Sequence, residues 1–269
     1  MAHSIDFVKR QMYYPIQIPH ILNKSFSESI QYSEEIVAEL KDFNICLWEM
    51  RPISNNTITV ENIIVADGCI DLIVDCNGKN IGFAGMSKTN FNFKINMPNY
   101  FIGARLKPGA FHLLTNIPAS SAMDNFLPIT AFDNDFDVDA FFSLSYQDAK
   151  KFIKKYIGSL AKNKKPSQFM LLFDELNKNI PDSVPEIYKK LYYSERQCQR
   201  LFAKNYGLSP QMILCVLRFQ NCLKSITSKN FTSKGILEAS NYYDQSHFIN
   251  DFKRNIGLTP FELLKKYTS

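Results

Sequence analysis

Short runs of β-branched and apolar residues fill the first part of the chain, and turn-forming residues separate them. The pairs Asp67-Gly68 and Asn77-Gly78 are two such turns, and runs of this length between turns are typical of antiparallel strands. We expect strands over 45–50, 57–60, 63–66, 70–74, 81–84, 91–95 and 100–106, preceded by a helix over 29–40. The regular spacing predicts an antiparallel barrel or sandwich of roughly eight strands, cupin-like in outline.

The pattern becomes helical after Pro108. Over 145–160 the apolar residues recur at spacings of three and four and share one helix face, while lysines occupy the other. This helix either packs on its own domain with a solvated lysine face or mediates dimerisation. The lysine-rich segment 161–167, which a proline interrupts, is the expected linker between a domain at 1–165 and a second domain at 166–269.

The C-terminal part contains one pattern twice. Residues 192–210 and 242–260 align at a constant offset of 50 positions, and seven of the 19 aligned positions are identical. Each copy has Ser or Asp at a helix N-cap position, an amphipathic helix and a Gly-Leu-Ser/Thr-Pro stop, and a long apolar helix over 211–226 joins the copies. Such a doubled unit predicts an all-α, double helix-turn-helix domain that places two helices in successive major grooves. The whole chain is therefore expected to be an α+β protein of two domains.

Composition narrows the classes of protein that fit. Hydrophobic residues make up 45% of the 269 residues, which excludes general disorder. No run approaches the ~20 apolar residues of a membrane-spanning helix, and residues 1–10 lack the apolar core of a signal peptide, so we expect a cytoplasmic protein without a membrane partner. The six cysteines and four histidines have no metal-ligand spacing. We therefore expect no metal, no cofactor and no enzymatic activity.

The net charge of +5 is confined to the C-terminal part. Residues 166–269 hold 14 lysines and arginines against 9 aspartates and glutamates, whereas residues 1–165 hold 17 of each kind. A local excess of positive charge suits a polyanion partner. It supports double-stranded DNA as the ligand of the repeated motif.

Several motifs in the repeat resemble the AraC/XylS family of bacterial transcription regulators. They are Gly207-Leu208-Ser209-Pro210, Asp244-Gln245-Ser246-His247-Phe248, Phe252-Lys253-Arg254 and Gly257-Leu258-Thr259-Pro260. The resemblance covers about 167–267 and implies seven helices in two helix-turn-helix subdomains that the long helix bridges. It also implies an activator or repressor that reads an asymmetric DNA site with both recognition helices.

Two stretches of the first part resemble a regulatory domain found in front of such modules. The run A-D-G-C-I-D at 66–71 is similar to its PDGC-x-D motif, and R-L-K-P-G-A at 105–110 is similar to its R-F-R-P-G-A motif. The likeness implies a sensor architecture but names no ligand.

Ten polar side chains on the two recognition helices are candidates for contact with DNA. They are Arg196, Gln199, Arg200, Lys204, Gln245, Ser246, His247, Asn250, Lys253 and Arg254. Arg196, Gln199 and Arg200 share one helix face, and such side chains read guanine and adenine in the major groove. The lysines and Arg254 suit phosphates instead. A solvated polar face is the alternative for the first trio, and His247 alternatively satisfies local backbone groups.

Two positions depart from the family pattern. Asn250 stands where the family usually has arginine, so the second recognition helix is expected to contribute less to affinity. Tyr192 stands near a usual glycine position, which predicts a strained or re-routed first turn. Arg218 on the long helix is expected to form a structural salt bridge, with a phosphate contact as the alternative. The long helix should hold the recognition helices about 34 Å apart, one duplex turn.

The β-rich part offers candidates for a ligand site. Trp48, Asp71 and Arg105 are the candidate contacts, and Asp67 is either a further polar anchor or part of a turn. Six aromatic residues either enclose an apolar pocket or form the core: Trp48, Phe83, Phe91, Phe93, Tyr100 and Phe101. The leading hypothesis is a regulator that senses a small-molecule effector, forms a homodimer and, if it is an activator, contacts RNA polymerase. The alternative is the same DNA-binding module controlled by a protein partner.

Overall fold

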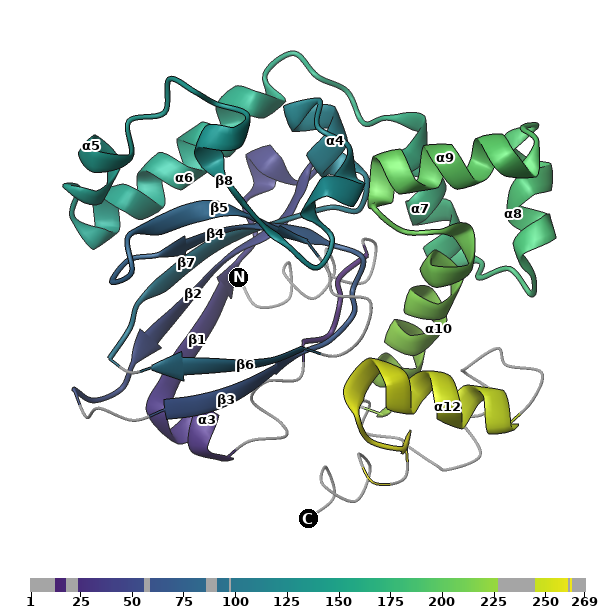
Figure 1. Cartoon of the computed structure of the whole chain (residues 1–269), viewed down its shortest axis with the longest axis horizontal. Helices are drawn as coiled ribbons and strands as arrows, with labels where there is room; N and C mark the ends of the chain where they lie inside the picture. Colours follow the sequence, from purple (N-terminus) through teal and green to yellow (C-terminus); the bar gives the residue numbers. More distant parts are fainter. Residues whose placement is uncertain are drawn as a thin grey trace.

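The β-rich part of the chain folds into two antiparallel sheets (Figure 1). The structure is a computed structural model that describes residues 13–17, 24–55, 59–85, 91–96, 98–226, 245–260 and 262. The larger sheet has the strand order β1-β2-β7-β4-β5-β8, and the smaller sheet pairs β3 with β6. The strands span Ile30–Glu35 (β1), Asn44–Pro52 (β2), Thr59–Ile64 (β3), Ile70–Asp75 (β4), Asn80–Gly85 (β5), Phe91–Asn96 (β6), Phe101–Leu106 (β7) and Phe126–Pro128 (β8). The predicted antiparallel β architecture is confirmed.

Alternation along the strands divides the two faces of the larger sheet. In β4, Leu72 and Val74 are buried in the cluster that includes the covering helices, whereas Asp71 and Ile73 are on the opposite face. Arg105 of β7 lies in register with Asp71 and shares that opposite face. One face of the sheet is therefore apolar, and the other carries charged residues into the space between the sheets.

Helices cover the apolar face (Figure 1). They are α4 (Ala110–Thr115), η2 (Ala119–Ala122), η3 (Ile129–Ala131), α5 (Val138–Phe142) and α6 (Tyr146–Ala161). The periodicity of α6 is confirmed, because Ala149, Ile153 and Ile157 are buried. Lys150 departs from the expected solvated lysine face, since its Nζ lies 2.9 Å from Glu49 Oε2 on the sheet.

The helix predicted over 29–40 is wrong. Strand β1 occupies half of this range, because Ile30, Tyr32 and Glu34 alternate with exposed residues and the segment pairs with β2. Only the short helices α3 (Lys24–Ser29) and η1 (Ala38–Leu40) flank the strand. The short period-2 pattern was hidden by helix-forming glutamates, and pairing with β2 overrode their propensity.

Two further details of the sheet differ from expectation. The separate strands predicted at 57–60 and 63–66 are represented by the single strand β3, and β8 was not predicted. Phe83 does not line a pocket with Trp48, because it packs on the opposite face of the sheet against Phe111, with ring centroids 5.1 Å apart. The side chains of Phe91 and Phe93 lie outside the described residues.

Five described helices follow the segment between α6 and α7. They are α7 (Gln168–Lys178), α8 (Val184–Leu191), α9 (Glu195–Tyr206), α10 (Pro210–Ile226) and α12 (Gln245–Ile256). Helix α10 is buried almost all round, as its composition predicted, and it contacts α8, α9 and α12. Figure 1 shows α9 and α12 near opposite ends of α10. The first helix expected in the second repeat copy, its turn and the cap Asp244 lie in 227–244, outside the described residues.

A continuous hydrophobic cluster connects the two sheets with the C-terminal helices. It runs from Trp48 in β2 to Phe173 in α7 and Val216 in α10. At the C-terminal end of α9, a Cβ on Gly207 would lie 2.7 Å from Met123 Cγ, so this helix end is packed tightly against the β-rich part. The packing between the two parts therefore fixes the orientation of α9.

Candidate nucleic-acid interface and buried ionic cluster

The first recognition helix, α9, begins and ends at caps that the sequence encodes. The Ser194 side chain accepts a hydrogen bond from Gln197 N, and the Gln197 side chain accepts one from Ser194 N, which is a capping box. Gly207 ends the helix with a φ of +75°. Tyr192 in the preceding turn has a φ of +55° and is 95% exposed. The strain predicted at this non-glycine position is confirmed, because a left-handed φ is unfavourable for a tyrosine.

Four candidate DNA contacts of α9 lie on its outer surface. Arg196, Gln199, Arg200 and Lys204 are all exposed, while the apolar stripe of the helix is buried. Gln199 Nε2 donates to the hydroxyl of Tyr188 in α8 at 3.0 Å, which orients this amide. The exposed face therefore offers three cations and an oriented amide to a partner.

The second recognition helix, α12, has the same division into faces. Phe248 and Phe252 are buried, and Phe252 meets Phe219 of α10 with ring centroids 5.2 Å apart. Ser246, Asn250 and Lys253 are exposed. The side chains of three further candidates lie outside the described residues: Gln245, His247 and Arg254.

Arg218 has a structural position on α10. Its side chain is buried, and its NH2 group donates to the carbonyl oxygens of Pro181 at 3.2 Å and Asp182 at 2.7 Å. These bonds hold the loop between α7 and α8 against α10. These bonds to backbone carbonyls support the structural interpretation of Arg218.

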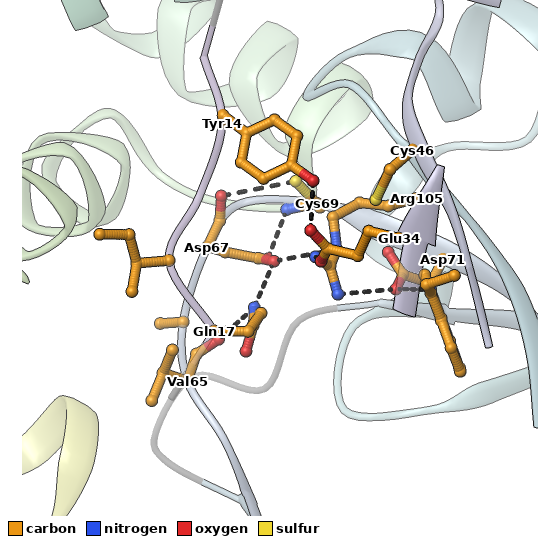
Figure 2. Close-up of polar contacts among 12 residues, drawn as sticks. Tyr14, Gln17, Glu34, Cys46, Val65, Asp67, Cys69, Asp71 and Arg105 are labelled. Atoms are coloured by element: carbon orange, nitrogen blue, oxygen red, sulfur yellow. Dashed lines mark hydrogen bonds and ion pairs between the residues drawn. The ribbon is translucent and has the colours of Figure 1, made fainter. Parts of the chain in front are cut away.

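Figure 2 shows an ionic cluster in the interior of the β-rich part, which we define as Glu34, Asp67, Asp71 and Arg105. The Arg105 guanidinium lies 3.3 Å from Glu34, 3.6 Å from Asp67 and 3.4 Å from Asp71. Trp48 Nε1 donates to Asp71 Oδ2 at 2.8 Å. The structure therefore brings together the three predicted ligand contacts, Trp48, Asp71 and Arg105. Asp67 is both an anchor of the cluster and part of a turn.

The segment before the first sheet adds hydrogen bonds to the carboxylates of the cluster. Tyr14 donates its hydroxyl proton to Glu34, and Gln17 Nε2 donates to Asp67 Oδ2 at 2.6 Å. Asp67 Oδ1 also accepts from Cys69 N at 2.9 Å, which closes the turn. Tyr14 and Gln17 thus join chain segments that are distant in sequence.

Burial and charge imbalance determine the protonation of the cluster. Three carboxylates surround a single guanidinium. Burial, reinforced by the charge of Asp67, raises the pKa of Asp71 to about 6 despite the attraction of Arg105. Burial also disfavours the Arg105 cation, but Asp71 and the other acidic neighbours overcome this and raise the pKa of Arg105. Arg105 therefore stays charged, while the surroundings of Asp71 favour its neutral form.

Sequence reasoning did not find Glu34, Tyr14 or Gln17. Glu34 lay in the segment predicted as a helix, and its alternation with Ile30 and Tyr32 was the signal that would have placed it inside the sheet. Tyr14 and Gln17 belong to a segment with no helix or strand of its own. Their roles depend on tertiary contacts that no local pattern encodes.

The family model described as "Helix-turn-helix domain" matches residues 187–266, from within α8 to beyond α12. The match includes both copies of the internal repeat and both recognition helices. The C-terminal side of the chain therefore holds an AraC-type helix-turn-helix domain, the DNA-binding domain of transcription regulators.

A second family model, "Domain of unknown function (DUF6597)", matches residues 37–128 of the β-rich part. No curated protein matches the chain. A DNA-binding transcriptional dual regulator from Escherichia coli K-12 is similar at 23% identity and a TM-score of 0.32, over 36% of this chain and 88% of that one.

Two structures of ToxT are similar over a longer part of the chain. ToxT from Vibrio cholerae O395 shares 15% identity at a TM-score of 0.40, over 90% of this chain and 99% of that one. ToxT from Vibrio cholerae strain SCE256, with an unsaturated fatty acid bound, shares 13% identity at a TM-score of 0.39, over 88% and 93%. TM-scores this low carry no argument about what the present chain binds.

Two further observations concern only the described part of the chain. No helix there has the length and apolar character needed to cross a membrane. No three of its histidine, cysteine, aspartate and glutamate side chains are grouped as a metal site would require.

Proposed function

We propose that the chain regulates transcription by reading successive major grooves of one DNA duplex with α9 and α12. The observation that carries this proposal is the outer face of α9, where Arg196, Gln199 and Arg200 are exposed within the matched family region. Arginine reads guanine and glutamine reads adenine in the major groove. Lys204 and Lys253 are exposed at positions suited to phosphates.

Helix α10 supports the spacing that this proposal needs. Its 17 residues make a rod of about 25 Å, and α9 and α12 contact it. The recognition helices lie near its two ends (Figure 1). This arrangement is compatible with a distance of about 34 Å between them, which is one turn of the duplex. Asn250 carries no charge, so α12 should add less affinity than α9.

Fluorescence anisotropy with labelled DNA tests the proposal. The probe is a duplex that the wild-type chain selects from a random 30-base-pair library. We expect an affinity that falls steeply with salt concentration, because lysines and arginines displace counterions from phosphates. The double variant Arg196→Ala/Arg200→Ala should bind at least ~30-fold more weakly, while Lys151→Ala, an exposed lysine on α6, is the matched control. Salt-independent binding, or unchanged binding by the double variant, contradicts the proposal.

We further propose that residues 1–165 receive the signal and residues 166–269 bind DNA. Trp48, Asp71 and Arg105 are the proposed ligand contacts, and their shared cluster supports this choice. Asp71 retains 15% exposure of its side chain, which makes it the partly accessible acceptor of this set of contacts. Native mass spectrometry of protein purified from its own host tests the proposed ligand site, since it reports a co-bound small molecule. The same measurement gives the subunit count and so tests the expected homodimer.

Control by a protein partner is the second candidate for the signal. It is favoured by Leu144 and Phe152, whose 39% and 36% exposure is high for large apolar side chains. Leu144 lines a pocket of about 210 Å³ with Phe141 and Tyr146, on the helix-covered side of the sheet and away from the ionic cluster. A protein partner, such as RNA polymerase for an activator, would bury these side chains. Mass spectrometry that finds a bound protein and no small molecule would select this candidate.

A further inference from the structure

Gln220 on α10 connects the DNA-binding helices to two segments of the β-rich part. Its side chain is only 1% exposed. Its Oε1 accepts from Ile16 N at 2.8 Å, and its Nε2 donates to Ala66 O at 3.0 Å and Ile16 O at 3.4 Å. We call the segments 13–17 and 65–69 the junction. A buried amide with both functions satisfied fixes its partners closely, because an unmade bond there is costly.

Tyr13 of the junction makes a second set of contacts to the DNA-binding helices. Its ring meets Phe173 of α7 edge to face at 4.9 Å, and Lys224 Nζ of α10 lies 5.6 Å from the ring centroid. Its hydroxyl donates to Asp67 O at 2.6 Å, so it also ties the two junction segments together. Gly68, with a φ of +74°, packs against Phe173 as well. The junction is therefore attached to both α7 and α10.

The same short segments form one wall of the ionic cluster (Figure 2). Asp67 faces Arg105 and Gln17 with its carboxylate, while the adjacent Ala66 carbonyl faces Gln220. Tyr14 donates to Glu34, while its neighbour Tyr13 contacts α7. In both segments, one residue touches the cluster and the next touches the DNA-binding helices.

We propose that Gln220 is a positioning residue for DNA binding, through which the junction makes the affinity for DNA depend on the charges of the ionic cluster. Close packing does not deform smoothly, so a junction residue that shifts on the cluster side must shift its Gln220 or Phe173 contacts as well. Because the end of α9 is packed against the β-rich part, such a shift changes the orientation in which α9 and α12 can contact DNA. The inference rests on the proposed function, since it requires that these helices bind DNA.

A double-mutant cycle tests the proposal in the full-length chain. The first change is Glu34→Gln, which removes a cluster charge on β1 at a residue that bonds Tyr14, Tyr32 and Arg105. The second is Gln220→Met, which keeps the side-chain volume and removes its hydrogen bonds. Glu35→Gln is the matched control, because Glu35 is exposed on the opposite face of the same strand. DNA affinity is measured with the selected duplex, and folding is checked by circular dichroism.

We expect Glu34→Gln to change the affinity for DNA at least ~5-fold in the wild-type background, and less than 2-fold in the Gln220→Met background. Equal changes in both backgrounds, or a folded Glu34→Gln variant with wild-type affinity, would overturn the proposal. If Glu34→Gln does not fold, Tyr14→Phe replaces it, since that change removes only the hydroxyl that bonds Glu34. Wild-type protein that fails to bind DNA refutes the proposed function itself, whereas DNA binding with an additive cycle refutes only the coupling.

Discussion

Asp71 occupies an environment that favours its neutral form. The carboxyl is buried beside Asp67, and Arg105 opposes the accumulation of negative charge. At the same time Trp48 Nε1 donates to Asp71, so the group is held in place in either protonation state. The pKa of Asp71 therefore depends on the charges of the ionic cluster.

The Asp71→Asn variant should remove one pH-dependent contribution to stability. Because the pKa of Asp71 is about 6 in the folded chain and lower when unfolded, the folded state binds the extra proton between about pH 4 and 6. Its contribution to stability is therefore lost as pH rises through that window. We expect the free energy of unfolding of Asp71→Asn, relative to that of the wild type, to increase from pH 4 to pH 7 in urea titrations. A constant or decreasing difference would contradict a raised pKa of Asp71 in the folded chain.

At the scale of elements, β7 must leave room for the indole of Trp48. A Cβ at Gly103 would lie 2.0 Å from the Trp48 ring, so glycine is required by close approach across the strand pair. Gly158 in α6 differs, because a Cβ there would lie 3.7 Å from Leu40, an ordinary contact distance. The two glycines provide a matched pair of substitutions.

Gly103→Ala should destabilise the chain by ~1–3 kcal/mol, because the added methyl group must displace Trp48 from its position beside Asp71. Gly158→Ala should stabilise by ~0.5–1 kcal/mol, since alanine is the better helix former. Chemical denaturation measures both effects, and the emission of the single tryptophan reports the displacement. A Gly103→Ala variant with wild-type stability and emission would contradict the packing described here.

Elements with a long, regular pattern were predictable from the sequence, and short ones with mixed signals were not. Helices α6, α9 and α10 follow from apolar periodicity and capping residues such as Ser194. Strand β1 was missed because its glutamates favour a helix and its partner strand supplies the compensating hydrogen bonds. Local propensity does not contain that pairing.

The candidate sites show the same limit. Arg196, Gln199 and Arg200 were placed on one exposed face by helical spacing alone. Asp71 and Arg105 were selected from the motifs, but Glu34 joins their network, and Gln220 bonds the adjacent junction, through contacts made only in the tertiary fold. The grouping of residues near the ionic cluster thus required the structure.

At the scale of the whole molecule, the continuous core joins the β-rich part to the C-terminal helices. Phe173 and Val216 belong to the same buried cluster as Trp48. Separation of the two parts would expose this surface and leave the hydrogen-bonding groups of Gln220 unpaired. The parts should therefore unfold together.

Thermal unfolding followed by two probes tests this expectation. The fluorescence of Trp48 reports the surroundings of the β-rich part. Far-ultraviolet circular dichroism at about 222 nm reports the helical content of the chain. We expect coincident transitions in the wild-type chain. In Gln220→Met the fluorescence and dichroism midpoints should move apart, and clearly separated midpoints in the wild type would contradict a shared core.

The central claim is that α9 and α12 read two successive major grooves on one face of a duplex. Hydroxyl-radical and methylation-protection footprinting of the selected duplex tests it most directly. The account predicts two protected regions about 10 base pairs apart on the same face of the DNA, with the Arg196→Ala/Arg200→Ala variant losing one region first. Protection of a single groove, or of two regions on opposite faces, would contradict it.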